Sequence, residues 1–274
     1  MGEGEGSLTE QAIDLRYEGR DDEAVALLRK AVDLGEPDAL PELAYALLNS
    51  RDPAEAVRVV EKAVKRGRTD LYSLLASLAS EVGDARKSER AYRAAIESGD
   101  ASALNDYGIF LRGQERYRES IEILRRACEL GDVLAPGNLV ATYANELGDL
   151  STAIEIGERY VDPGRPSVYP ALAAAYAKAG RLEQADDLFR QGIEVGSPKS
   201  HQAYAWFLWT GRNDPVAAER QFWLAFDADE PNWSLGLGEL LIELGRREEA
   251  RAVLERGAEW GDLDARALLN ENGL

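Results

Sequence analysis

The sequence is poor in the residues from which most catalytic and metal sites are built. It has one cysteine, Cys128, one histidine, His201, and one methionine among 274 residues. A single cysteine excludes an intrachain disulfide, and a free cysteine on a helix is usually a small buried apolar side chain rather than a nucleophile. A lone histidine early in a helix is more often a surface or packed residue than a general base. We therefore expect no catalytic residue, no cofactor and no metal, and a protein that is not an enzyme.

Common phosphate and zinc motifs are missing as well. The sequence contains no glycine-rich phosphate loop, no CxxC pair and no HExxH. Adjacent carboxylates such as Asp186 and Asp187 are frequent, but neighbouring side chains on a helix point about 100° apart and do not converge on one ligand. These acids are typical of a solvated surface.

No long hydrophobic run is present. Purely apolar runs such as Ala171 to Ala177 are far too short to span a bilayer. The first residues lack the charged leader and apolar core of a signal peptide. We therefore expect a cytoplasmic protein. Residues 1–6, MGEGEG, combine glycine with acid and are expected to be disordered.

The charge is strongly one-sided. There are 50 acidic and 32 basic residues, a net charge of −18, and the acids are spread along the chain. Such a field repels nucleic acid and anionic membranes, so neither is expected as a partner. It favours a protein or peptide partner with a basic segment. The alternative is that the acids form a solvated surface that only keeps the protein soluble.

What the sequence does contain is one unit repeated eight times. In GRLEQADDLFRQGIEVG, residues 180–196, the small Ala185, the large Phe189 and the small Gly192 fall on one face of a helix. Sliding this pattern along the chain gives steps of 32, 32, 32, 33, 32, 33 and 32 residues. The first small residue of each unit is Ala24, Ala56, Ser88, Ser120, Ala153, Ala185, Ala218 or Ala250.

Each unit closes on a residue suited to ending a helix. Seven of the eight closing positions hold glycine, which readily adopts the left-handed conformation that stops a helix. The closing position of the seventh repeat holds Asp229 instead. The glycines are Gly35, Gly67, Gly99, Gly131, Gly164, Gly196 and Gly261.

A second apolar stripe follows each closing position and marks a partner helix. Its large residue is Leu43, Leu75, Tyr107, Leu139, Leu172, Tyr204, Leu237 or Leu269. Neither helix of a pair can bury its stripe alone, so the pairs must stack on one another. The sequence therefore predicts an all-α solenoid of about eight antiparallel helix pairs, with a capping helix over 262–274. We expect a single domain over 7–274, with repeats at about 7–35, 36–67, 68–99, 100–131, 132–164, 165–196, 197–229 and 230–261.

These residues resemble a known repeat family. Leu172-Ala173 and Tyr176 in a first helix, followed by Ala185 and Phe189 in a second, are similar to the tetratricopeptide repeat (TPR). The period is shorter than the 34 residues usual in that family. The turns ELGDVLAPGNLV (129–140) and EWGDLDARALLN (259–270) instead resemble the Sel-one-like repeat. The resemblance covers residues 7 to 270 and implies a right-handed superhelix whose first helices line a concave groove for a partner peptide or helix.

Mapping that groove onto this chain gives a set of candidate binding residues. They are Tyr45, Asn105, Ile109, Arg112, Asn145, Lys178, Trp206 and Trp209. A subgroup of the family clamps a terminal carboxylate with Lys and Asn in consecutive first helices. The matching slots here hold residues such as Pro41, Ser73 and Gly137, so the resemblance does not extend to that role.

The tryptophans are unevenly distributed. All five lie in the last quarter, and Trp206 and Trp209 are offset from the core stripe onto the expected groove face. Small residues in the preceding first helices, from Gly137 to Ala177, suggest a shallow hollow beside them. Aromatic anchors next to pockets are typical binding hot spots. The alternative is that both rings simply pack against the following repeat.

Repeat five departs from the pattern. Gly157 and Tyr160 exchange the large and small positions, and two prolines flank Gly164 in the next turn. The sequence is compatible with a hinge and equally with a tight turn that has compensating packing.

Three functions fit the sequence. The first is a non-enzymatic scaffold or adaptor that holds a partner peptide or helix in the groove. The second is a regulatory receptor for a small signalling peptide. The third is a self-associating structural protein. Taking the three together, the expected oligomeric state is a monomer or a weak homodimer.

Overall fold

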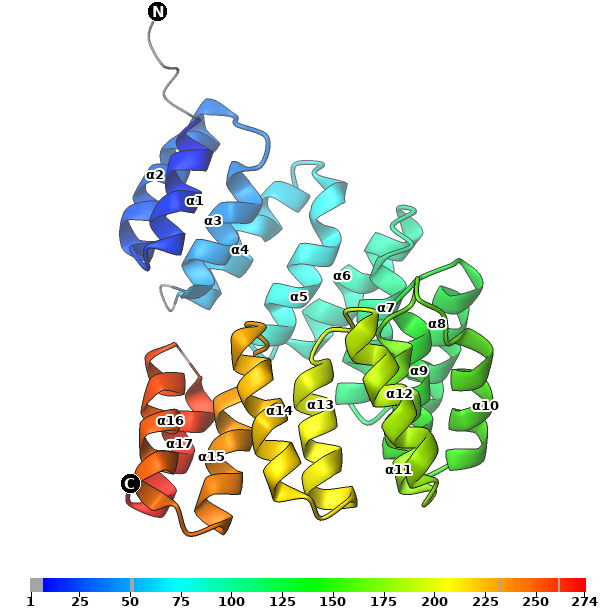
Figure 1. Ribbon diagram of the computed structural model, residues 1–274. Coiled ribbons are helices and arrows are strands. Elements are labelled where there is room, and N and C mark those ends of the chain that lie inside the picture. Colours follow the sequence, from blue (N-terminus) through cyan, green and yellow to red (C-terminus); the bar gives the residue numbers. More distant parts are fainter. Residues whose placement is uncertain (1–6, 50–51, 232, 261) are drawn as a thin grey trace, which may run out of the picture. The chain divides into compact units, whose positions relative to one another are not determined.

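The computed structural model describes residues 7–49, 52–231, 233–260 and 262–274 (Figure 1). Residues 1–6, expected to be disordered, lie outside this range. The described residues form seventeen α-helices and no strand. The first helices of the pairs and the cap are α1 (Leu8–Tyr17), α3 (Ala39–Asn49), α5 (Tyr72–Glu81), α7 (Ala103–Gly113), α9 (Ala135–Ala141), α11 (Val168–Lys178), α13 (Ser200–Trp206), α15 (Trp233–Glu243) and α17 (Leu263–Asn272). The second helices are α2 (Asp21–Leu34), α4 (Pro53–Val64), α6 (Ala85–Glu97), α8 (Tyr117–Glu129), α10 (Leu150–Tyr160), α12 (Leu182–Glu194), α14 (Pro215–Asp227) and α16 (Arg247–Glu259).

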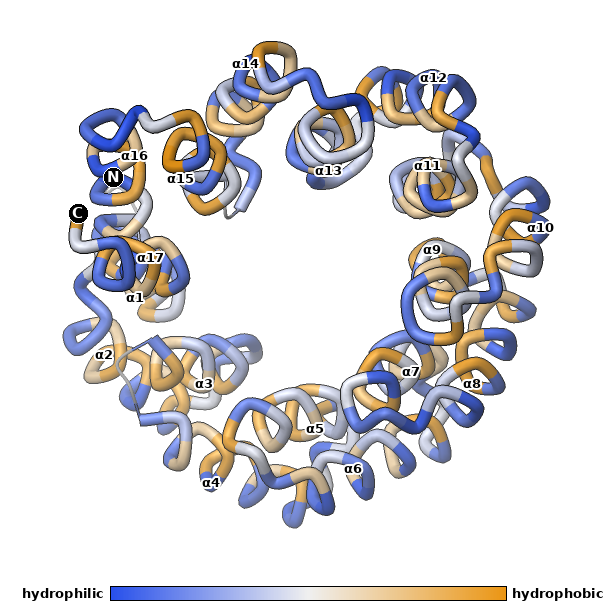
Figure 2. Tube along the Cα trace, turned by 90° about the horizontal axis from the view of Figure 1, so that it is seen from below, coloured by the Kyte–Doolittle hydropathy of each residue, from blue (hydrophilic) through white to orange (hydrophobic). Residues whose placement is uncertain are grey.

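The helices fall into two compact units, Met1–Gln114 and Glu115–Leu274. In the second unit, first helices α9, α11, α13 and α15 form an inner row and second helices α10, α12, α14 and α16 an outer row (Figure 2). In the first unit, α1, α3 and α5 likewise form one row, and α2, α4 and α6 form the other. This alternation of helix pairs confirms the all-α repeat architecture that the sequence predicts.

The small residue that defines each repeat is buried without exception. All eight of these positions are 0% exposed, including the two serines, Ser88 and Ser120. The large residue four positions later is equally buried in repeats one, two, four, seven and eight, where it is Leu28, Val60, Leu124, Phe222 and Leu254. Since a small side chain lets the neighbouring helix approach closely, the large one can fill the adjoining groove.

Most closing positions have the predicted left-handed backbone. Gly35, Gly67, Gly99, Gly131 and Gly196 have φ between 68° and 102°. Asp229 replaces glycine in repeat seven and still takes a φ of 52°. Gly164 is the exception to our prediction: α10 ends instead with Val161 in an extended conformation, and the Gly164 amide donates to Asp162 Oδ1 at 2.8 Å. Gly261 lies outside the described residues.

The two 33-residue steps have a structural cause. They are the steps from Ser120 to Ala153 and from Ala185 to Ala218. Each contains a π-helical segment at the end of a first helix, Thr142–Glu146 after α9 and Phe207–Gly211 after α13. One extra residue in an α-helix is commonly accommodated as such a π-turn. The insertion therefore lies in the inner-row helices and not in a loop.

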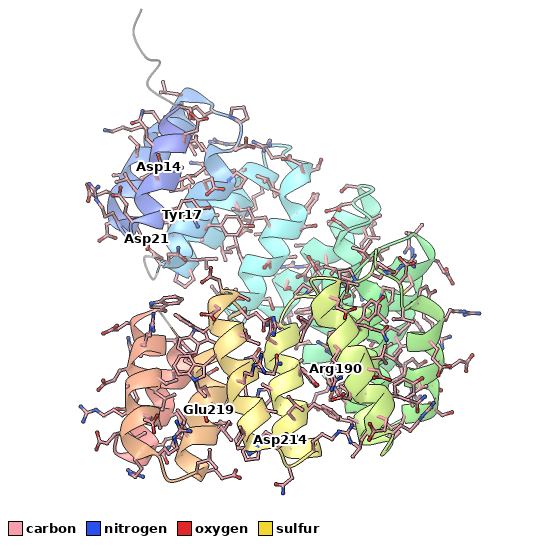
Figure 3. All side chains as sticks on the ribbon, viewed as in Figure 1. Asp14, Tyr17, Asp21, Arg190, Asp214 and Glu219 are labelled. Carbon is pink, nitrogen blue, oxygen red and sulfur yellow. The ribbon has the colours of Figure 1, made fainter. Side chains whose placement is uncertain are left out.

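Helix starts follow the sequence closely. Asp84, Asp149 and Asp214 accept hydrogen bonds from backbone amides of α6, α10 and α14, and Pro215 occupies the first position of α14. Figure 3 labels Asp214, at the start of α14. Proline is tolerated there because the first amides of a helix have no partner inside it. For the same reason Pro41, Pro136 and Pro170 fit, since each lies in the first turn of α3, α9 or α11.

In four of the eight repeats, the residue after the closing position ties the two helices of the repeat together. In five of the eight repeats it is an acid: Glu36, Asp100, Asp132, Glu230 or Asp262. The Glu36 carboxylate accepts from the amides of Leu8 and Thr9 at the start of α1, at 3.2 and 3.0 Å. Glu230 does the same for α13, and Asp100 and Asp262 accept from serine hydroxyls at the starts of α5 and α15. An acid at this position thus holds the start of the first helix against the end of the second.

Repeat five has compensating packing. A Cβ at Gly157 would lie 2.6 Å from Leu172 Cδ1, so the Leu172 side chain of α11 fills the place that a large residue takes in other repeats. Tyr160 lies beneath the Arg165 guanidinium, 5.5 Å from its carbon to the ring centre. The exchange of large and small positions is therefore accommodated by the next first helix.

The capping helix α17 packs on the last pair through one small residue. Ala265 is 0% exposed, and its Cβ would lie 3.3 Å from a Cβ at Gly257 of α16. Asp262 caps α17 by accepting from the amides of Asp264 and Ala265. Leu263, at the start of the helix, stays 70% exposed, so the cap covers only part of the last pair.

Candidate functional site

The inner row of the second unit presents a continuous face of first-helix side chains. Four of the candidate binding residues belong to it: Asn145, Lys178, Trp206 and Trp209. They come from the segments α9 to α13, with α15 next in the row (Figure 2). We call the exposed side of α9, α11, α13 and α15, together with the π-helical segments that extend α9 and α13, the inner face of the second unit.

Trp206 and Trp209 form the most prominent group on this face. Their rings stack at 5.0 Å between centres and 24° between planes, and both are half-buried. Trp206 also meets the fully buried Phe222 edge-on at 5.8 Å. Trp209 instead reaches the next repeat, where its Nε1 lies 3.4 Å from Glu243 Oε1. Both rings thus pack against the core cluster, and Trp206 has in addition the ring contact with the fully buried Phe222.

The π-turns carry two of the candidate residues. Trp209 lies in the π-helical segment after α13, and Asn145 lies in the one after α9. A π-turn shifts the residues of the last helical turn relative to a regular α-helix, and such turns occur frequently at functional sites. The extra residue in repeats five and seven therefore changes the inner face itself.

Asn145 and Lys178 occupy equivalent places in consecutive first helices and touch each other. Lys178 Nζ donates to Asn145 Oδ1 at 2.6 Å, and both side chains are exposed. Further along the row, burial raises the pKa of Glu239 in α15 above its ordinary value. The inner face therefore has a cation on α11 and carboxylates, Glu239 and Glu243, on α15, with the two tryptophans between them.

The remaining candidates belong to the first unit. Tyr45 and Ile109 are 45% and 37% exposed, and the Arg16 guanidinium lies over the Tyr45 ring at 6.0 Å. Arg112 is half-buried. Asn105, which we expected to face a groove, is only 3% exposed, and its amide donates to Asp106. Asn105 is therefore not on an accessible surface, because it lies too near the core side of α7.

The small residues that suggest a hollow are partly filled. A Cβ at Gly137 would lie 2.8 Å from the carbonyl oxygen of Ser167, so the backbone of the next turn occupies that space. Ala144 is also buried, whereas Ala174 and Ala177 are half-buried. The expected hollow does not extend to Gly137.

Cys128 and His201, whose side chains could in principle act as a nucleophile and a general base, are held in structural contacts. Burial, with a further contribution from Asp132, raises the pKa of Cys128 to about 11, so the thiol is protonated at neutral pH. His201 Nδ1 lies 2.9 Å from Gln221 Oε1, and the His201 amide donates to Glu230. A thiolate is the reactive form of cysteine, so nothing at Cys128 favours nucleophilic chemistry.

The described part of the chain contains no group of three or more His, Cys, Asp or Glu side chains placed to hold a metal ion. Among its helices, none has both the length and the apolar character needed to cross a bilayer.

Comparison with known protein families shows which family the chain belongs to. Models of the tetratricopeptide repeat match residues 9–70, 73–137 and 235–260, which together are more than half of the chain. The chain belongs to the tetratricopeptide repeat family. Members of this family are in general protein-binding scaffolds. A search of curated proteins gave no match.

Solved structures of TPR and related proteins have the same fold. A tetratricopeptide repeat protein from Parabacteroides merdae is 16% identical, with 96% of each chain covered and a TM-score of 0.56. Yeast Tom70 is 17% identical over 93% of this chain and 60% of its own, with a TM-score of 0.68. A Sel1 repeat protein from Oxalobacter formigenes is 22% identical over 80% of this TPR chain and 99% of its own, with a TM-score of 0.50. At these identities the likeness concerns the fold alone.

Proposed function

We propose that the protein is a non-enzymatic scaffold that binds an extended segment or helix of a partner protein along the inner face of the second unit. The observation that carries this proposal is the half-buried Trp206–Trp209 stack, with ring centres 5.0 Å apart, at the end of α13 and the start of the π-helical segment that follows it. Stacked aromatic rings offer a large rigid apolar surface at a small entropic cost, and tryptophan is enriched among binding hot spots.

The charges around the stack suggest how a partner would lie. Lys178 is on α11, whereas Glu239 and Glu243 are on α15. A partner segment with an apolar side chain on the tryptophans would thus meet a cation on one side and carboxylates on the other. Since the chain as a whole carries a charge of −18, a basic residue near Glu239 and Glu243 is the favoured orientation.

The two tryptophans call for different substitutions. Because Trp206 packs on Phe222, its removal is expected to loosen the core as well as the face. Trp209→Ala is the cleaner variant, since this ring packs at the edge of the core cluster and its ring contact is with Trp206 rather than with the buried Phe222. The matched control is Trp223→Ala, which removes a ring that is 38% exposed on the outer-row helix α14.

A pull-down from native lysate with wild type, Trp209→Ala and Trp223→Ala tests the proposal. We expect a partner that is retained by wild type and by Trp223→Ala and lost with Trp209→Ala. For a purified partner, the expected loss is about 2 kcal/mol or more, close to thirtyfold in Kd. Equal retention by all three proteins would refute this site, and recovery of only the protein itself would favour self-association.

A further inference from the structure

One pocket of the first unit lies among α2, α3 and α4. It has a volume of about 500 Å³ and opens between the C-terminal halves of the second helices α2 and α4. Its floor is apolar: Val32 and Val59 are half-buried, and beneath them lie the buried Leu40 and Leu43 of α3. This size is within the range of pockets that hold small ligands or a few side chains.

The rim of this pocket is basic in a strongly acidic protein. Arg29, Lys62, Arg66 and Arg68 all line it. Arg29 is paired with Glu55 at 2.6 Å, and Arg68 is paired with Asp70 at 2.7 Å. The side chains of Lys62 and Arg66 are exposed, and neither side chain forms an ion pair or hydrogen bond with another described residue.

The acids that line the pocket do not neutralise these cations. Two carboxylates belong to the lining, Asp33 and Glu36. Glu36 already accepts hydrogen bonds from Leu8 and Thr9 at the start of α1. Because Arg29 and Arg68 are already paired with Glu55 and Asp70, the excess positive charge at the rim comes from Lys62 and Arg66, which face one exposed carboxylate of the lining, Asp33.

The basic residues are particular to the second repeat. Arg66 stands where the other repeats with a regular closing turn have Leu34, Ser98, Leu130, Val195, Ala228 and Trp260. Arg68 stands where five repeats have an acid, which in four of them ties the first helix to the second. Helix ends do not require these cations, because α2, α6, α12 and α14 have no basic residue in the last turn. Both departures change the charge in the same direction at one pocket.

We propose that this pocket is a second binding site, which takes an acidic peptide segment of a partner protein with an aliphatic side chain among its carboxylates. The aliphatic side chain would lie on Val32 and Val59, and the carboxylates would pair with Lys62 and Arg66. The apolar floor favours a peptide over a nucleic acid. The phosphates of a nucleic acid could pair with the cations of the rim, but a nucleic acid has no aliphatic side chain to pack on the floor. The −18 charge of the chain further disfavours a long nucleic acid, whose phosphates would extend past the pocket over the acidic surface.

The test uses a short fluorescein-labelled peptide in which pairs of glutamates alternate with single leucines. Its binding to the full chain is followed by fluorescence anisotropy at about 50 mM and about 300 mM NaCl. The double variant Lys62→Gln/Arg66→Gln should bind about tenfold more weakly at the lower salt, because two ion pairs are lost. The matched control Arg86→Gln/Arg90→Gln changes the net charge equally on exposed sites of α6 and should bind as wild type does.

A second variant tests the apolar floor. Val59→Thr keeps the side-chain shape but adds a hydroxyl, and it should weaken binding of the leucine peptide without changing the salt dependence. A peptide with serine in place of leucine should be insensitive to this substitution.

Three results would overturn the proposal. They are no binding of the peptide to wild type at about 1 mM, equal weakening by both double variants, and tighter binding of a single-stranded oligonucleotide or inorganic phosphate at the same residues. None of these outcomes depends on Trp209, so this site and the inner face can fail separately.

Discussion

A single methyl group at Gly257 tests how closely the last helix pair is packed. In α16, a Cβ at this position would lie 2.0 Å from Ser234 Oγ and 2.4 Å from Ser234 Cβ. Rotation of the serine hydroxyl relieves the first contact but not the second, because Cβ is fixed to the backbone of α15. Gly257→Ala must therefore push α15 and α16 apart.

The cost can be worked out from three contributions. Overpacking a close helix contact costs about 1–3 kcal/mol. Ser234 Oγ also donates to Asp262 Oδ2 at 2.7 Å, and loss of a hydrogen bond to a charged group costs about 1.5–3 kcal/mol. Alanine returns up to about 1 kcal/mol through its higher helix propensity. The expected net loss in the free energy of unfolding is about 2 kcal/mol or more.

The assay is urea unfolding followed by far-UV circular dichroism, with amide hydrogen exchange of α17 as the local readout. Because Asp262 caps α17, faster exchange should appear there first. The matched control is Gly113→Ala, at a helical glycine whose Cβ would meet no atom within 4 Å, and it should be neutral or stabilising. Ser234→Gly in the Gly257→Ala background should partly restore stability. A Gly257→Ala protein as stable as wild type would refute the reasoning.

Two further predictions follow from other elements. Deletion of Thr210, in the π-helical segment Phe207–Gly211, restores a 32-residue step. In thermal unfolding it should lower the free energy of unfolding by only about 1 kcal/mol, mainly through loss of the hydrogen bond from the Thr210 hydroxyl to the Trp206 carbonyl. Deletion of Glu243 from the regular helix α15 should lower it several times more. Hydrogen bonds from the Thr9 hydroxyl, and then from the Thr9 and Leu8 amides, lower the pKa of Glu36. The stabilisation of α1 by Glu36 is therefore complete above the ordinary pKa of about 4.3, and it is lost as the pH falls through the lower pKa of the folded protein. Exchange of the α1 amides should increase over that acidic range in wild type and stay flat in Glu36→Gln; equal pH profiles would contradict this.

The repeat stripe was predictable because burial of one small and one large residue repeats in register. Ala24 and its seven equivalents are all fully buried, as spacing alone indicates. The step lengths also signalled two extra residues, but their location depends on tertiary packing. A loop could have absorbed each residue, whereas the structure has them as π-turns beside Asn145 and Trp209.

The candidate site was only partly accessible from sequence. From their positions in the repeat, Asn105 and Lys178 are both expected on the groove face, yet Asn105 is buried and Lys178 is exposed. Exposure of a helical residue depends on neighbouring side chains, which a repeat pattern does not specify. The basic pocket has a local signal in KAVKRGR, residues 62–68, but its apolar floor comes from α2 and α3.

The central claim is that a partner lies on the inner face of the second unit. A photo-crosslinking amino acid placed at Glu239 on the inner-row helix α15, or at Glu255 on the outer-row helix α16, tests this directly in native lysate. The account predicts a discrete crosslinked partner from position 239 that disappears with Trp209→Ala, and none from position 255. The same partner crosslinked from position 255 alone, or from position 239 regardless of Trp209, would contradict it.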